Sequence, residues 1–76
     1  MNYKDVISSG QIVCENESLG MIVVWDGNNK FQVFDVWDLN NVMEVDEFTC
    51  YTKTLDSAKM AAENYFDELM QEVAAA

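Results

Sequence analysis

The sequence predicts an α+β fold, in which an antiparallel meander of three or four strands carries one C-terminal helix packed across one face. Short apolar runs separated by turn-forming residues occupy positions 11–52, and their short connections favour antiparallel neighbours. From position 55 the apolar residues change to the spacing of a helical face. With 76 residues, the chain is expected to form a single domain over 1–76.

The first half of the predicted sheet contains two strands. Residues 1–10 are of mixed character and end in a turn signal (SSG). Residues 11–15 (QIVCE) form a short strand candidate, and 16–20 have the composition of a turn. Residues 21–25 (MIVVW) predict a strand most strongly, because β-branched side chains lie in an unbroken apolar run. The DGNN sequence at 26–29 predicts a hairpin, since glycine and asparagine tolerate positive φ.

The second half of the predicted sheet shows an irregular alternation. In 30–39 (KFQVFDVWDL), Phe31 and Val33 fall on one face, whereas the next apolar pair falls on the other. Either this strand is covered on both faces or a bulge shifts its register. Residues 42–52 (VMEVDEFTCYT) predict the final strand, again with apolar residues at both parities.

The C-terminal segment predicts an amphipathic helix over about 55–73. Thr54 is the expected N-cap, and Asp56 in the first turn suits the positive end of the helix dipole. The residues expected to face the sheet recur every three or four positions: Leu55, Ala58, Ala62, Tyr65, Phe66, Leu69 and Val73.

The charge balance restricts the classes of partner. Fourteen acidic residues accompany only four lysines, with no arginine and no histidine, so the net charge is −10. Direct binding to nucleic acid is not expected, because the chain would repel a polyanion. An anionic membrane is disfavoured for the same reason, and no apolar run approaches the roughly 20 residues that span a bilayer. A basic protein surface, in contrast, would be attracted.

The N-terminus lacks the basic and apolar regions of a signal peptide. A cytoplasmic location is therefore expected, which is the host cytoplasm if a phage encodes the protein. Cys14 and Cys50 form no CxxC pair and are expected to be reduced, buried thiols.

The composition does not favour catalysis. Without histidine the chain cannot form a Ser-His or Cys-His nucleophile, and one helix on a small sheet rarely encloses a substrate pocket. We therefore expect no enzyme activity, no catalytic residue, no cofactor and no dedicated metal ligands. EF-hand frames that start at Asp26 or Asp38 fail because the fifth position is Lys30 or Val42. A looser divalent-cation site stays an alternative.

The acidic residues predict two partner-binding patches. In the helix, pairs four positions apart place like charges on one side, and in the last predicted strand Glu44 and Asp46 are expected on one face, about 6.8 Å apart. Such spacings are of the same order as phosphate separations in nucleic acid. The first predicted patch consists of Asp35, Asp38, Glu44, Asp46 and Glu47, and the second of Glu63, Asp67, Glu68 and Glu72. An exposed Trp25 or Trp37 beside these carboxylates would have the composition of an interface hot spot.

In size, acidity, lack of histidine and order of elements, the chain resembles the small phage proteins directed against host defences, namely anti-CRISPR proteins and DNA-mimic inhibitors. The resemblance covers the whole chain but involves no motif. It implies an inhibitor that occupies a basic nucleic-acid channel of its target.

The function predicted from the sequence is non-enzymatic binding of a basic protein surface, that of a nucleic-acid-binding effector. Each carboxylate would pair with lysine or arginine of the partner. Two alternatives stay open: a small interaction domain that homodimerises through a strand edge or an aromatic patch, and a protein that binds divalent cations loosely. The protein is accordingly expected to be a monomer or a homodimer.

Overall fold

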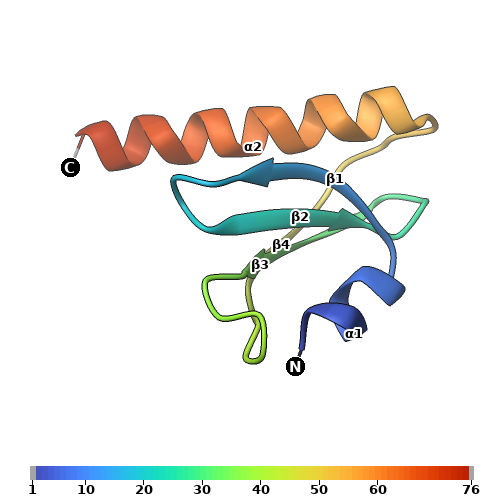
Figure 1. The fold of residues 1–76 in the computed structure, drawn as a ribbon. Helices are drawn as coiled ribbons and strands as arrows, with labels where there is room; N and C mark the ends of the chain where they lie inside the picture. Colours follow the sequence, from blue (N-terminus) through green and yellow to red (C-terminus); the bar gives the residue numbers. More distant parts are fainter. Residues whose placement is uncertain (1, 76) are drawn as a thin grey trace.

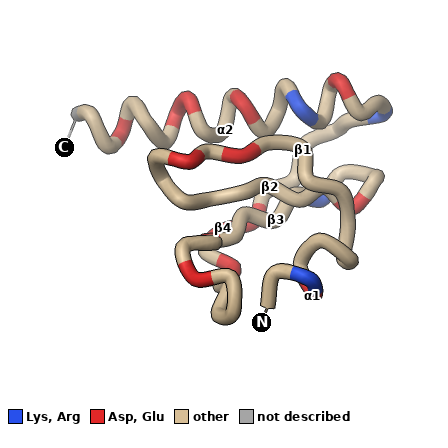
Figure 2. The backbone as a smooth tube through the Cα atoms, viewed as in Figure 1, with Lys and Arg blue, Asp and Glu red and all other residues tan. Residues whose placement is uncertain are grey.

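The computed structural model describes residues 2–75 and confirms the predicted α+β fold. One antiparallel sheet has the order β1-β2-β3-β4, and α2 lies across one of its faces (Figure 1). Acidic residues occur on the strands, on the turns between them and along α2 (Figure 2). The elements in chain order are α1 (Tyr3–Ser8), β1 (Gln11–Asn16), β2 (Met21–Trp25), β3 (Lys30–Asp35), β4 (Met43–Thr49) and α2 (Leu55–Ala75).

The short helix α1 was not predicted from the sequence. Asn2 caps it, because its side chain accepts a hydrogen bond from the Asp5 backbone N–H at 3.0 Å. Val6 is its one buried residue and is fully inaccessible to solvent. A helix of six residues presents fewer than two turns, so its apolar periodicity is too short to recognise.

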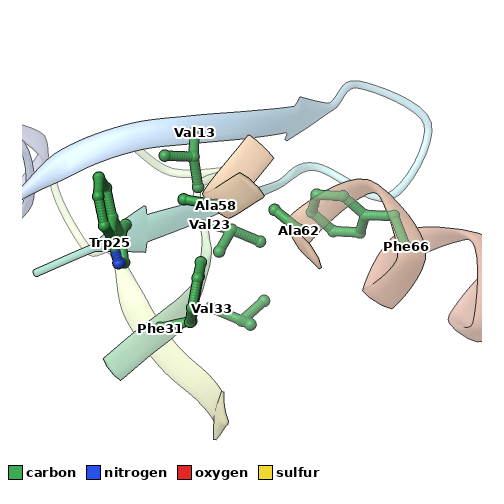
Figure 3. Packing of buried hydrophobic residues seen from close by; sticks show 8 residues of the cluster. All are labelled: Val13, Val23, Trp25, Phe31, Val33, Ala58, Ala62 and Phe66. Carbon is green, nitrogen blue, oxygen red and sulfur yellow. The ribbon is translucent and has the colours of Figure 1, made fainter. Parts of the chain in front are cut away.

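The larger core lies between α2 and the sheet (Figure 3). Ala58 and Ala62 are fully buried, and their small side chains let α2 approach the strands closely. Phe66, which is 4% exposed, fills the space further along the helix. Five buried side chains of β1, β2 and β3 complete this cluster: Val13, Val23, Trp25, Phe31 and Val33.

A second, smaller core covers the opposite face of the sheet. It joins Val6 of α1 to buried residues of the sheet and of the segment that follows β3: Ile22, Val24, Phe34 and Val42. The irregular alternation in 30–39 has the first of the two causes left open for it, because β3 is covered on both faces. The bulge lies in β4 instead, where Val45 is an extra residue that shifts the register against β3.

Two strands are shorter than predicted. β3 ends at Asp35 instead of Leu39, because both neighbouring strands end opposite it, at Met21 of β2 and at Met43 of β4. The Val36 N–H adds one more hydrogen bond of the same ladder, to the Gly20 carbonyl at 2.8 Å. β4 begins at Met43 and ends at Thr49, inside the predicted range 42–52.

The helix α2 agrees with its prediction at the N-terminus and extends two residues further at the C-terminus. The Thr54 hydroxyl accepts a hydrogen bond from the Ser57 N–H at 3.1 Å, which confirms Thr54 as the N-cap. Val73 was expected to face the sheet, but it is 57% exposed. The end of α2 projects past the turn between β1 and β2, so no strand lies beneath it (Figure 1).

Candidate protein-binding surface

The bulge at Val45 separates two carboxylates that were expected on one face. Asp46 lies opposite Val33, whose side chain belongs to the core beneath α2, whereas Glu44 lies opposite Phe34, which belongs to the other core. Residues that pair across a ladder share a face. The prediction that Glu44 and Asp46 lie on one face is therefore wrong, because one extra residue reverses the alternation.

Asp46 instead connects β4 to α2. Its Oδ2 accepts a hydrogen bond of 2.8 Å from the Tyr65 hydroxyl, and its Oδ1 accepts one of 2.9 Å from the Glu47 N–H. Burial and this hydrogen bond to Asp46 raise the pKa of Tyr65 to about 12, and the negative charges of Asp46 and Glu72 add to the effect. The sequence analysis did not identify Tyr65 as a site residue, because the contact joins positions 19 apart.

The four predicted carboxylates of α2 lie on two flanks of the helix. Glu68 and Glu72 line a hollow together with Asp46 and Tyr65 on the β4 side. Glu63 and Asp67 lie toward Cys14 of β1 instead, since both raise the pKa of that thiol. The two predicted patches are thus divided differently in the structure: Asp46 joins Glu68 and Glu72.

The β1 side of α2 brings two carboxylates of the helix near the Cys14 thiol. Burial is the main cause of the raised pKa of the Cys14 thiol, followed by the negative charge of Glu63, with smaller effects from Asp67 and Glu15. Glu15 follows Cys14 in the chain but lies on the opposite face of the sheet, because it pairs with Ile22 of the second core. This flank of α2 therefore presents Glu63 and Asp67. Cys14 and Cys50 are both free and half-buried, in partial agreement with the expected buried thiols.

The remaining carboxylates of β4 lie on the face opposite α2. Glu44 accepts a hydrogen bond from the Gln32 side-chain amide at 3.3 Å. Glu47 forms a 3.5 Å ion pair with Lys30, and the two side chains are 60% and 49% exposed. Such exposed pairs contribute little to stability. It is the one salt bridge within residues 2–75.

Asp35 and Asp38 shape the segment between β3 and β4. Their Oδ1 atoms accept hydrogen bonds from the backbone N–H groups of Trp37 at 3.0 Å and of Asn40 at 2.9 Å. Each carboxylate thus closes a local turn.

Trp37 lies between these two carboxylates and is 69% exposed. One part of its ring covers Gly20, where an added Cβ would lie 2.3 Å from the ring. Trp25 is buried instead, and its indole N–H donates to the Asn28 carbonyl at 3.0 Å. The condition stated for a hot spot, an exposed tryptophan beside carboxylates, is met at Trp37.

Three hollows lie in a row where β4 and the residues after it face α2, and we call this row the groove. Its central hollow, of 290 Å³, is lined by Phe48 and Cys50 and, from α2, by Ala61 and Tyr65. A 160 Å³ hollow beside Asp46 and a 260 Å³ hollow near the start of α2 adjoin it and share lining residues with it. The groove is apolar at its centre and acidic toward the C-terminal end of α2.

The lysines are unevenly distributed. Lys59 is the last basic residue of α2, and the four predicted carboxylates follow it. Figure 2 accordingly shows basic positions near the start of α2 and only acidic positions along the rest of it. The negative charge of this part of the surface is therefore uncompensated within the described chain.

Among residues 2–75, no three carboxylates or thiols converge at positions that would hold a metal ion. Within the same residues, neither helix is both long and apolar enough to cross a bilayer. Comparison of the chain with protein-family models, with curated proteins and with solved structures yields no match.

Proposed function

We propose that this protein is a non-enzymatic binding protein that occupies a basic surface of a partner in the cytoplasm. The partner class that fits best is a nucleic-acid-binding effector, such as a CRISPR effector, whose channel the protein would block. The observation that supports this proposal is the uncompensated acidic surface: fourteen acidic residues, and one exposed ion pair within residues 2–75.

The arrangement of the carboxylates supports steering toward a basic partner. Of the nine predicted binding residues, eight are exposed and Asp35 is half-buried. A surface of one sign raises the rate of encounter with an oppositely charged partner through its long-range field. Trp37 adds a large exposed ring to which an arginine side chain can stack.

The experiment that tests the proposal is a pull-down from bacterial lysate with the tagged protein, washed at low and then at raised salt. We expect a nucleic-acid-binding protein to be retained at low salt, released by salt and displaced by added DNA. The variant Glu63→Lys/Asp67→Lys/Glu72→Lys reverses three charges of this surface and should retain much less of that nucleic-acid-binding protein. Retention that resists both salt and DNA would contradict occupation of a nucleic-acid surface.

A second candidate function is homodimerisation through the edge of β4, where Met43 and Val45 are both exposed. Association of two copies would bring together two chains of charge −10, which opposes it. Light scattering over a range of protein concentrations decides between the two: a mass that doubles with concentration supports the dimer.

A further inference from the structure

No strand among residues 2–75 pairs with the outer edge of β4. β4 pairs with β3 alone and ends the sheet order. Six of its seven residues are exposed, and only Phe48 is half-buried. The apolar side chains of Met43 and Val45 are 59% and 47% exposed. An edge with these properties is a template for the addition of a further strand.

The direction of the backbone groups shows where an added strand would bind. The Cys50 N–H donates to the Asn29 carbonyl beside β3 at 2.9 Å. Because alternate residues of an antiparallel strand point their backbone groups to opposite sides, those of Thr49 and Glu47 point away from β3. The outward N–H of Glu47 already donates a hydrogen bond to Asp46 Oδ1, so an added strand can use it only after that bond is broken.

The groove beneath α2 lies next to this edge. A fifth strand would run about 4.8 Å from β4 and direct every second side chain toward α2. A side chain opposite Phe48 would meet the apolar centre of the groove, with Ala61 and Tyr65. The side chain two positions away would meet Asp46, Glu68 and Glu72.

We propose that β4 receives, as a fifth strand, an extended segment of the partner protein that carries an apolar residue and a lysine or arginine two positions apart. The apolar residue enters the hollow at Phe48, and the cation pairs with Asp46, Glu68 and Glu72. By pairing with Asp46, the cation frees the Glu47 N–H for a carbonyl of the added strand. This inference rests on the proposed function, because it specifies how a basic partner is held.

Charge complementarity favours this occupant over a second copy of the chain. β4 carries Glu44, Asp46 and Glu47 and no basic residue. Pairing of two β4 strands would therefore place carboxylates opposite carboxylates, which is destabilising. A basic strand meets the same carboxylates with opposite charge.

The test uses a fluorescently labelled short peptide of repeating Val-Thr-Lys-Thr, in which valine and lysine lie two positions apart on one face, with binding measured by anisotropy. The control peptide has the same sequence with the threonine backbone nitrogens methylated, so that its charge is unchanged but it cannot pair with Glu47 and Thr49 while its valine and lysine face α2. We expect the control to bind about tenfold more weakly. Equal affinity of the two peptides would overturn strand addition.

Two protein variants of equal charge locate the site. Asp46→Asn/Glu68→Gln/Glu72→Gln removes the carboxylates beside the groove. Glu15→Gln/Glu63→Gln/Asp67→Asn removes the same number elsewhere, two on the other flank of α2 and one on the far edge strand β1. We expect the first variant to lose about tenfold in peptide affinity and the second to lose far less. An equal loss in both would overturn the location, because it would reflect net charge alone.

A third variant, Thr49→Pro, removes an outward N–H at an exposed edge position where proline is tolerated. This variant should bind the unmethylated peptide more weakly than the wild type does, while circular dichroism confirms that the fold is kept. If the peptide fails to bind but the pull-down partner is still released by salt and DNA, strand addition is wrong and the proposed function stands. If neither is bound, both are wrong.

Discussion

The hydroxyl of Tyr65 in α2 donates a 2.8 Å hydrogen bond to Asp46 on the edge strand β4. The Tyr65 ring also stacks on Phe48, with centroids 5.0 Å apart, and Phe48 stacks on Phe31 at 4.8 Å. A row of aromatic rings thus continues from β3 through β4 to α2 and ends in a polar contact at the surface. This row holds the helix over the side of the sheet that borders the groove.

The first prediction concerns the hydrogen bond alone. Tyr65→Phe keeps the stacked ring and removes the donor to Asp46, so we expect the free energy of unfolding to fall by about 1 kcal/mol, measured by urea denaturation. Tyr51→Phe is the matched control, because Tyr51 is 87% exposed. An unchanged stability in Tyr65→Phe would show that water replaces the contact without cost.

The second prediction concerns alkaline pH. The pKa of Tyr65 is raised to about 12 in the folded protein, by burial and by the hydrogen bond to Asp46, above its ordinary value of about 10. Because the folded state holds this proton more tightly, the stabilisation is complete below pH 10 and is lost as the pH rises toward 12. In a pH titration followed by tyrosinate absorbance, one tyrosine should ionise at a higher pH than the others, and Tyr65→Phe should abolish that step. A titration in which all tyrosines ionise together would contradict the shift.

The third prediction compares two glycines with positive φ, Gly20 at +63° and Gly27 at +88°. A Cβ at Gly20 would clash with the Trp37 ring, whereas nothing lies within 4 Å of one at Gly27. We expect Gly27→Ala to cost about 1 kcal/mol through backbone strain alone, and Gly20→Ala to cost more. The additional loss should largely disappear in Gly20→Ala/Trp37→Ala, measured by thermal unfolding. If the two single variants lose equal stability, the ring does not rest on Gly20 in solution.

The fold could be predicted because its determinants are local. The spacing of apolar residues determines the face of α2, and the DGNN turn determines the hairpin between β2 and β3. The helix α1 is too short to show a period, and the end of β3 depends on where its two neighbours end, at Met21 and Met43, which the sequence of β3 does not mark.

The candidate site could be predicted only in composition. The carboxylates are exposed as expected, but their grouping depends on one bulge residue, Val45, which no local pattern marks. Its effect is to place Asp46 beside Glu68, although the sequence assigned them to different patches.

The fourth prediction tests the core beneath α2. Phe66 is 4% exposed, so Phe66→Asp buries an unpaired charge and should abolish the cooperative unfolding transition. Phe66→Ala should be milder, with a loss of about 3–5 kcal/mol. Glu63→Gln, one turn earlier and exposed, should leave the transition nearly unchanged. A folded Phe66→Asp variant would show that α2 is not required for the sheet.

The fifth prediction concerns salt. The protein has a net charge of −10 and one exposed ion pair within the described residues. Its carboxylates therefore repel one another more in the compact folded state than in the expanded unfolded chain. Sodium chloride screens this repulsion, so the melting temperature should rise with ionic strength, and it should rise less in Glu63→Gln/Asp67→Asn/Glu72→Gln. Calcium chloride at matched ionic strength separates screening from binding: an equal rise means screening, and a much larger rise would reveal a divalent-cation site among the carboxylates. Because no metal-binding cluster occurs among residues 2–75, we expect the two salts to act alike.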